Sequence, residues 1–233
     1  MKPLPIVLLL AAALAGAAAG FLVFRDHSMP APGLVQITAP AAPTPTEVSA
    51  ATEASPPPAP AIPATVPDIS LPDLAGKTVA LRSTDGHPRL FNFWATWCEP
   101  CRREIPLLNT LQVAHAGDGL RIVGIAVDFR DAVKTYLKAH PLRYTSLVGE
   151  ESGLEAAQKF GMDLLLPFSV FADDQNRIVA VKVGELHQDE AEAILSAMRR
   201  LKAGEMNLAD TQAAIAGTMK QLATTRAKQS TAK

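Results

Sequence analysis

The chain has only two cysteines, Cys98 and Cys101, and only Glu99 and Pro100 separate them. Without further thiols the chain cannot be built on a framework of structural disulfides, so its 233 residues must fold around a hydrophobic core. Two thiols at this spacing suit a redox pair or one half of a zinc site. A zinc site needs further ligands, and none of the five histidines has the spacing of paired zinc-binding histidines. The sequence therefore favours a redox pair.

The cysteines lie between a predicted strand and a predicted helix. Residues 89–95 are a short, mostly apolar run typical of a buried strand, and residues 100–114 place apolar side chains at helical spacing. Cys98 is expected at the helix entry, where the helix dipole and free backbone N–H groups favour a thiolate. Cys101 is expected one turn later, in a more buried place. This geometry assigns the attack on a substrate disulfide to Cys98 and the release of the mixed disulfide to Cys101.

Strands alternate with helices over residues 68–203, which we predict to be one domain. This alternation favours an α/β fold with a mostly parallel or mixed sheet that helices cover on both faces. Residues 204–233 are expected to form a C-terminal tail, with weak helical spacing. The other expected elements are hairpins over 69–81 and 168–183, a strand over 120–127, and helices over 131–140, 152–160 and 188–202.

The N-terminal third of the chain has a different composition. Leu4 to Phe24 is an uncharged apolar run of 21 residues, about the length that a helix needs to cross a bilayer. A cleaved signal peptide is the alternative, but this run is longer than the usual apolar core of such a peptide. We therefore expect residues 1–24 to be a transmembrane anchor with a cytoplasmic N-terminus. Residues 25–67 hold 11 of the 19 prolines and are expected to be a disordered tether.

Charge and chemistry limit the partners. The net charge of −1 gives no basic excess for binding nucleic acid, so we expect no nucleic-acid partner. Dithiol–disulfide exchange requires only the two sulfur atoms of the protein. We therefore expect neither a cofactor nor a bound metal.

The segment from Phe91 to Pro106, which reads Phe-Asn-Phe-Trp-Ala-Thr-Trp-Cys-Glu-Pro-Cys-Arg-Arg-Glu-Ile-Pro, resembles the active-site segment of the TlpA/ResA-like family. Members of that family are membrane-anchored thiol–disulfide oxidoreductases. The resemblance covers about residues 66–201, and its layout of anchor and tether agrees with residues 1–67. It implies a thioredoxin-like fold with an N-terminal β-hairpin. It also implies reduction of protein disulfides in the periplasm, with electrons from an inner-membrane donor and clients in cytochrome c or copper-site maturation.

The resemblance also implies a role for Glu104. This residue stands three positions after Cys101, where the family places an acidic residue beside the thiols. A carboxylate there is able to relay protons during exchange, and it would favour a reducing protein because it disfavours a thiolate. The alternative is an ordinary first-turn glutamate favoured by the helix dipole. Thioredoxin has a buried aspartate where this chain has Asn92, which moves the proton-accepting role towards Glu104.

Pro167 stands where the family has a cis-proline that shapes the groove for a substrate backbone. Leu164-Leu165-Leu166 precedes this proline and Phe168 follows it, where the family commonly has small polar residues. The groove beside Cys98 is therefore expected to be unusually apolar. The other residues expected to support the site are Trp97, Glu99 and Pro100.

Three other functions suit the same thiols. An oxidant or isomerase of the DsbA type is disfavoured because Glu99, between the thiols, opposes thiolate formation. A thiol peroxidase carries Pro and Thr before its reactive cysteine, where this chain has Phe91 and Ala95. A copper-binding chaperone is able to hold Cu(I) with two thiolates, but no histidine lies within ten residues of the pair on either side.

Overall fold

A computed structural model describes residues 61–82, 86–163 and 165–231. The predicted anchor at 1–24 lies outside these ranges, as does the predicted tether up to residue 60. In the described ranges, no helix combines the length and the apolar character that crossing a membrane requires.

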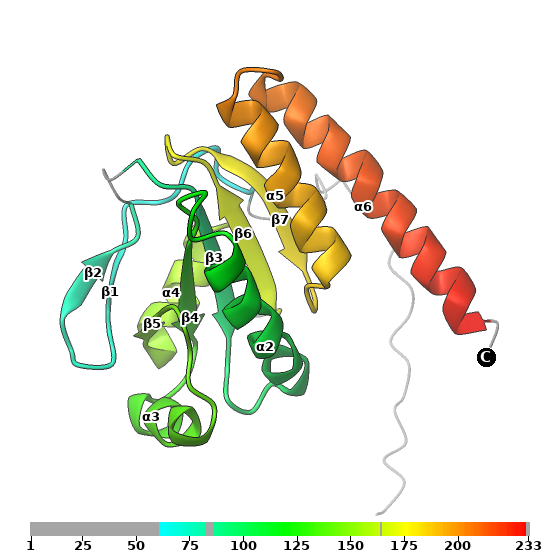
Figure 1. Ribbon diagram of the computed structural model, residues 1–233. Coiled ribbons are helices and arrows are strands. Elements are labelled where there is room, and N and C mark those ends of the chain that lie inside the picture. The colour runs from blue at the N-terminus through cyan, green and yellow to red at the C-terminus, as the bar shows by residue number, and fades with distance from the viewer. Residues whose placement is uncertain (1–60, 83–85, 164, 232–233) are drawn as a thin grey trace, which may run out of the picture. The chain divides into compact units, whose positions relative to one another are not determined.

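A mixed sheet of five strands forms the centre of the domain, in the order β5-β4-β3-β6-β7 (Figure 1). Strands β3, β4 and β5 run parallel to one another, whereas β6 is antiparallel to β3 and β7 is antiparallel to β6. This is the mixed sheet expected from the sequence. The strands are β3 (Arg89–Trp94), β4 (Arg121–Ala126), β5 (Thr145–Val148), β6 (Phe168–Ala172) and β7 (Ile178–Val183).

Helices cover both faces of this sheet. Leu90 of β3 packs in a cluster with residues of α2 and α5, while its neighbour Phe91 packs with Phe160 at the end of α4 on the opposite face. This division follows from the period of two in a strand. The helices are α2 (Glu99–Ala114), α3 (Arg130–Ala139), α4 (Glu150–Lys159), α5 (Gln188–Lys202) and α6 (Leu208–Thr231).

The predicted N-terminal hairpin is confirmed as β1 (Ser70–Pro72) and β2 (Thr78–Ala80), which pair antiparallel. Asp73 Oδ1 accepts hydrogen bonds from the backbone N–H groups of Ala75 and Lys77, and Gly76 supplies the positive φ of +92° that closes the turn. The second predicted hairpin is confirmed as β6 and β7.

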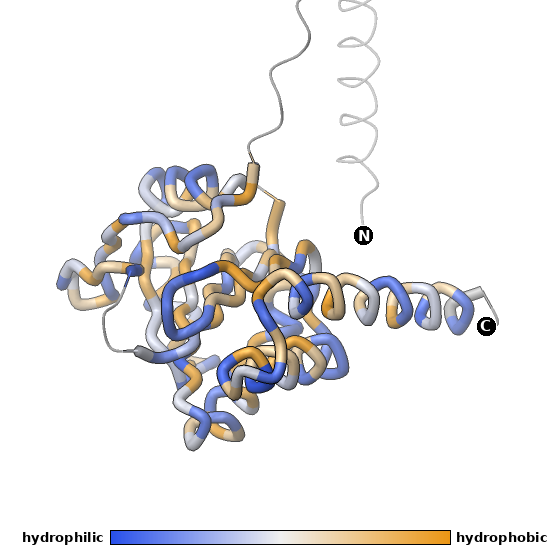
Figure 2. The backbone as a smooth tube through the Cα atoms, turned by 90° about the horizontal axis from the view of Figure 1, so that it is seen from above, coloured by the Kyte–Doolittle hydropathy of each residue, from blue (hydrophilic) through white to orange (hydrophobic). Residues whose placement is uncertain are grey.

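Helix α6 is longer than the weak spacing of the tail indicated, since it spans 24 residues. Figure 2 shows why the pattern is weak: hydrophilic and hydrophobic residues alternate along α6. Only Thr211 and Ile215 are buried among its described side chains, and Gln212 donates a hydrogen bond to the carbonyl of Ile178 in β7. Tertiary contacts with α5 and β7, rather than an apolar stripe, therefore hold this helix.

Candidate active site

The two cysteines form a disulfide at the start of α2, with their Cα atoms 5.3 Å apart. Cys98 is the N-cap residue, and its Sγ accepts the backbone N–H of Cys101 at 3.3 Å. The exposed fraction is 6% for Cys98 and 0% for Cys101. The structure therefore confirms the predicted placement, with Cys98 at the helix entry and the more accessible of the two. Pro100 lies in the first turn, where a missing N–H costs no helical hydrogen bond.

Asp128, just after β4, fixes the loop that carries the cysteines. Its Oδ2 accepts the backbone N–H of Thr96 at 2.8 Å and the Thr96 hydroxyl at 2.6 Å, and its Oδ1 accepts the N–H of Phe129 at 2.7 Å. The buried Asp128 carboxylate thus links Thr96, which precedes Trp97, to the backbone N–H of Phe129. Trp97 and Phe129 are 63% and 64% exposed. Two large apolar side chains therefore stand in solvent on adjoining loops beside Cys98.

The Leu166–Pro167 peptide bond is cis, as the resemblance implies. Leu166 packs against the cluster that contains both cysteines, so this loop lies beside the thiol pair. Leu165 is 57% exposed and adds apolar surface there. The expectation that Phe168 makes the groove beside Cys98 more apolar is wrong, because its ring is fully buried and stacks on Phe93 at 4.2 Å. Leu164 lies outside the described residues.

Glu104 is buried beneath the helix that carries the cysteines. It is 1% exposed and lies one turn after Cys101 on the same side of α2. Its Oε1 accepts a hydrogen bond from Asn92 Nδ2 at 2.7 Å, and its Oε2 accepts the backbone N–H of Leu186 at 2.8 Å. The alternative of an ordinary solvated first-turn glutamate does not fit this burial. A groove of about 330 Å³, lined partly by Arg103, Glu185 and Leu186, reaches Glu104 from outside.

Burial raises the pKa of Glu104 to about 7, because an ionised carboxylate loses hydration there. The hydrogen bonds from Leu186 and Asn92 act against this shift, and so does the positive charge of Lys182. The negative charge of Glu185 adds to it. Glu104 therefore changes its protonation state near neutral pH, as a proton-relaying group requires.

Asn92 belongs to a polar row that crosses the sheet beneath α2. Asn92 Nδ2 also donates to Ser169 Oγ at 3.1 Å. Within the described part of the chain, Asn92 Oδ1, Trp94 Nε1, Tyr144 Oη and Ser146 Oγ are buried without a hydrogen-bond partner. A Cβ on Gly124 would come within 3.2 Å of both the Tyr144 ring and Trp94 Nε1, so glycine leaves room for them. Residues of the row, paired in register from β5 to β7, are Ser146, Gly124, Asn92, Ser169 and Lys182.

Glu99 lies apart from this buried chemistry. Its side chain is 73% exposed and pairs with Arg103 at 3.3 Å. Solvent and Arg103 screen its charge, so its effect on the thiols is smaller than its position between them suggested. Two buried acids lie near the pair: Asp128, which holds the loop before Cys98, and Glu104, one turn after Cys101.

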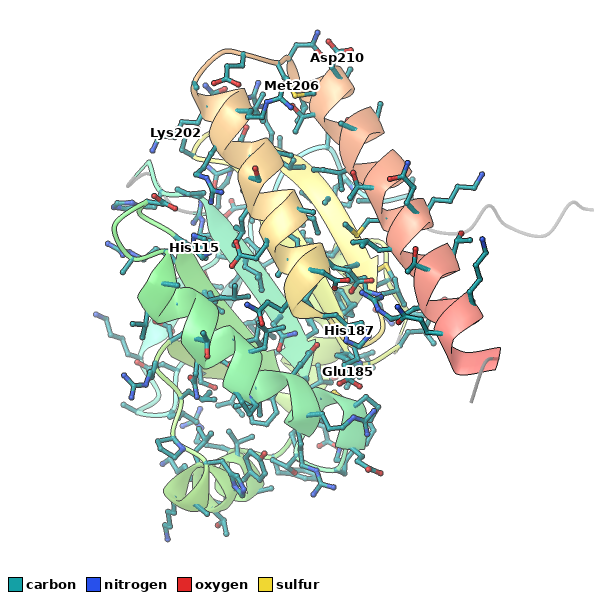
Figure 3. All side chains as sticks on the ribbon, turned by 45° about the vertical axis from the view of Figure 1, so that its right-hand side comes forward. His115, Glu185, His187, Lys202, Met206 and Asp210 are labelled. Atoms are coloured by element: carbon teal, nitrogen blue, oxygen red, sulfur yellow. A yellow bond between two sulfur atoms is a disulfide. The ribbon has the colours of Figure 1, made fainter. Side chains whose placement is uncertain are left out.

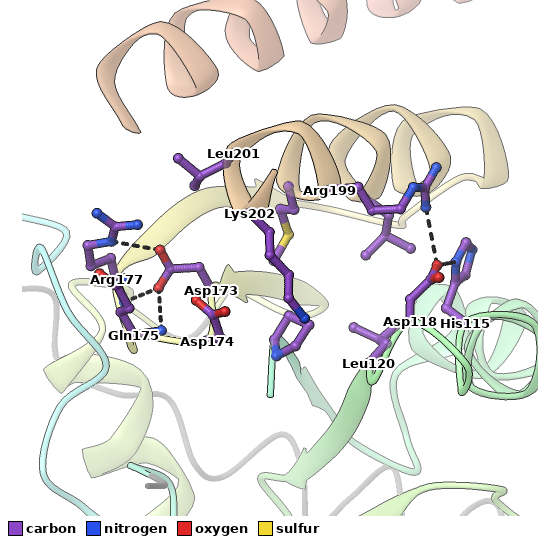
Figure 4. A pocket seen from close by; sticks show the side chains of 13 residues that line it. His115, Asp118, Leu120, Asp173, Asp174, Gln175, Arg177, Arg199, Leu201 and Lys202 are labelled. Atoms are coloured by element: carbon purple, nitrogen blue, oxygen red, sulfur yellow. Dashed lines mark hydrogen bonds and ion pairs between the residues drawn. The ribbon is translucent and has the colours of Figure 1, made fainter. Parts of the chain in front are cut away.

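A second cavity, of about 120 Å³, lies between α5 and the turn from β6 to β7 (Figure 4). His115 at its edge contacts Asp118 at 3.0 Å and Glu192 at 3.2 Å, and Arg199 pairs with Asp118 at 3.5 Å. None of the residues predicted from the sequence to form the redox site lines this cavity.

Comparison with known proteins identifies the family. The Redoxin family model matches residues 63–196, which is more than half of the chain. The chain belongs to the Redoxin family. Among similar proteins, thiol-disulfide oxidoreductase ResA of Bacillus thuringiensis subsp. konkukian is 31% identical over 130 residues, covering 55% of this chain and 73% of ResA. Thioredoxin-like protein YneN of Bacillus subtilis is 33% identical over 132 residues, covering 54% and 74%.

Solved structures agree with this family. A secreted thiol-disulfide isomerase from Corynebacterium glutamicum superposes with a TM-score of 0.50 at 25% identity, covering 54% of this chain and 80% of that one. A Chlorobium tepidum protein provisionally described as the thiol:disulfide interchange protein DsbE gives 0.51 at 25% identity, covering 57% and 91%. The thioredoxin-like fold and the TlpA/ResA-like resemblance are confirmed. This Redoxin-family chain is a thiol–disulfide oxidoreductase.

Sequence reasoning missed the partners of Glu104. Asn92 was noted only as a departure from thioredoxin, although it donates directly to the Glu104 carboxylate. Leu186 contributes its backbone N–H from 82 residues away, and no side-chain pattern reveals such a contact. Lys182 is the partner of Glu104 that the sequence could have indicated, because it is a charged residue inside the apolar run of β7.

Proposed function

We propose that this protein reduces disulfides of client proteins outside the cytoplasm through Cys98 and Cys101, with Glu104 as the proton-relaying group. The observation that carries this proposal is the buried Glu104 carboxyl, one turn from Cys101, with a pKa of about 7. A negative charge there opposes thiolate formation at the pair. Because stabilised thiolates make a pair oxidising, this environment favours a reductant.

The reaction proceeds by two exchanges of disulfide bonds. The Cys98 thiolate attacks one client sulfur, forming a mixed disulfide and releasing the other client sulfur as a thiolate that takes up a proton. Cys101 then loses its proton towards the ionised Glu104 and attacks Cys98 Sγ. This step releases the second client thiol and closes the Cys98–Cys101 disulfide. Two electrons pass from the protein to the client, and a dithiol donor must return them.

The location and partners are part of the same proposal. Residues 1–24 anchor the chain in the bacterial inner membrane and residues 25–67 tether the domain on the periplasmic side. An inner-membrane donor then supplies electrons, and clients are disulfide-containing proteins such as those of cytochrome c or copper-site maturation. The similarity to a thiol-disulfide oxidoreductase, ResA, supports clients that contain disulfides.

The reduction potential tests the direction of the reaction. We expect equilibration with glutathione to give a value more negative than the roughly −180 mV of protein disulfide isomerase. A potential near that of DsbA, about −120 mV, would contradict a reductase and favour the oxidant alternative. The change in Trp97 fluorescence while the dithiol form reduces a protein disulfide reports the same exchange in real time.

The exposed aromatic side chains beside Cys98 are proposed to dock apolar segments that flank the client disulfide. Replacing Trp97 and Phe129 together with alanine is expected to raise KM for protein clients by about tenfold, because two buried contacts of a bound client are lost. Oxidised glutathione, which has no apolar segments flanking its disulfide, should be reduced at an unchanged rate. Val113→Ala is the matched control, since Val113 is 56% exposed on α2 but lies at its far end. Equal losses for both substrates would contradict docking.

A further inference from the structure

Helix α6 lies beyond the region that the Redoxin model matches, yet it reaches the start of α5. The two helices lie side by side (Figure 1). Arg226, near the end of α6, contacts Asp189 Oδ1 through Nη2 at 2.6 Å and Glu190 Oε1 through Nη1 at 2.7 Å. Both acids belong to the first turn of α5. The Glu190 side chain is only 3% exposed and the Arg226 side chain is 33% exposed, so this ion pair is partly shielded from solvent.

Glu190 also organises the loop that leads into α5. Its Oε2 accepts the backbone N–H of His187 at 3.0 Å, and Lys182 Nζ lies 3.2 Å from its Oε1. The preceding N–H, that of Leu186, donates to Glu104 at 2.8 Å. Figure 3 shows Glu185 and His187 on this loop, at the N-terminal end of α5. Two successive peptide groups thus join two buried carboxylates, and α6 contacts one of them.

We infer that Arg226 is a positioning residue for Glu104, which it influences through Glu190, the loop at residues 185–187 and Lys182. This inference rests on the proposed role of Glu104 in proton relay. Among the contacts of the described residues, those of Arg226 are with the two acids of α5 and not with the thiols. It sets where the loop N–H groups and the Lys182 ammonium lie, and these groups stabilise the ionised form of Glu104.

The charges around both acids give the direction of the effect. Burial alone would raise the pKa of Glu190, but its partners Arg226, the His187 N–H and Lys182 outweigh burial and lower it. Without Arg226, Lys182 is the remaining cation on Glu190 among the described contacts, and it is drawn away from Glu104. Loss of order in the loop would also weaken the bond from the Leu186 N–H to Glu104. Both changes disfavour the Glu104 carboxylate, so its pKa should rise.

The other charged or titratable groups that face Glu104 act on it both in the unmodified protein and when Arg226 is replaced. Glu185, on the loop, raises the pKa of Glu104, and Arg103 on α2 holds Glu185 at 2.7 Å. Tyr144, the residue before β5, also interacts with Glu104, and its own pKa is raised by burial first and by Glu104 second. None of these groups contacts Arg226 in the described structure, so their effects should persist when Arg226 is replaced.

The test compares pH profiles of disulfide reduction in the full chain, with oxidised glutathione as the substrate. For Arg226→Ala we expect the midpoint near pH 7 to move up by about half a unit, equal to about a threefold loss of rate below the midpoint. Arg226→Lys should reverse most of this shift because it returns a cation to Glu190. Arg200→Ala is the control, since Arg200 pairs only with exposed Glu205 at 3.1 Å among the described contacts.

A midpoint that stays in place in folded Arg226→Ala would overturn the inference. If the alanine variant does not fold, Arg226→Gln removes the positive charge but keeps a shorter polar side chain, and it carries the same expectation. A change of overall rate without a change of midpoint would also overturn it, because that outcome indicates a purely structural role. Glu104→Gln separates the two proposals: if it abolishes the midpoint while Arg226→Ala leaves it unmoved, proton relay stands and positioning by α6 fails.

Discussion

A Cys101→Ala variant is expected to hold its client as a mixed disulfide on Cys98. The accessible Cys98 sulfur is able to attack, but without Cys101 no protein thiol remains to release the client. Catalysed reduction should fall on the order of a hundredfold or more, while the trapped complex accumulates. Non-reducing electrophoresis of cells that express the variant, followed by mass spectrometry of the trapped partner, measures this result and identifies the client.

Cys98→Ala is the matched variant for the trapping experiment. It leaves Cys101, which is fully buried, as the remaining thiol, so a large client should not form a stable adduct. The double variant Cys98→Ala/Cys101→Ala gives the background. Equal trapping by the two single variants would show that the assignment of the attacking sulfur is wrong.

Glu104→Gln is expected to slow disulfide reduction at neutral pH by roughly 10- to 100-fold, the lower part of the range for general acid–base catalysis. The unmodified protein should lose activity as the pH falls through about 7, because protonated Glu104 cannot accept the Cys101 proton. In the variant this part of the pH profile should be missing, and only thiol ionisation should remain. A profile with its midpoint near 7 unchanged would refute the role of Glu104.

The same variant should change how stability depends on pH. The pKa of Glu104 is about 7 in the folded protein and has an ordinary value of 4.5, so the folded state holds an extra proton between these values. The contribution of Glu104 to the free energy of unfolding should therefore be greatest below about pH 4.5. It should fall by about 3 kcal/mol as the pH rises from there through 7. Denaturant unfolding at several pH values should show this decline in the unmodified protein and a smaller one in Glu104→Gln.

Local patterns were sufficient to predict most of the fold. The apolar run of β3, the helical spacing of α2 and the turn residues of both hairpins act over a few neighbours, and the elements predicted between residues 69 and 202 agree with the structure within two residues. Strand β5 was not predicted. It is only four residues long, and its backbone pairs with β4 and Asp73, whose positions the local sequence does not reveal.

The site divides in the same way. The two cysteines and Pro167 were found because they carry a recognisable motif and resemblance. The burial of Glu104, in contrast, depends on Asn92 in β3 and on a peptide N–H from the loop after β7. Arg226 was not singled out because its partners Asp189 and Glu190 lie on another helix, 37 and 36 positions earlier in the chain.

Both outer strands of the central sheet have part of their free edge covered. At the edge of β5, Asp73, which follows β1, forms a bridge with Leu147. At the edge of β7, Thr65 forms a bridge with Arg177, and the N–H of Ile178 donates to the carbonyl of Ala64. Exposed strand edges recruit other extended chains, which leads to aggregation. A client protein with an unpaired strand would be able to add that strand to an open edge. Covered edges reduce the chance that such a client adds to the sheet, which favours contact through the thiol surface and release once its sulfurs are reduced.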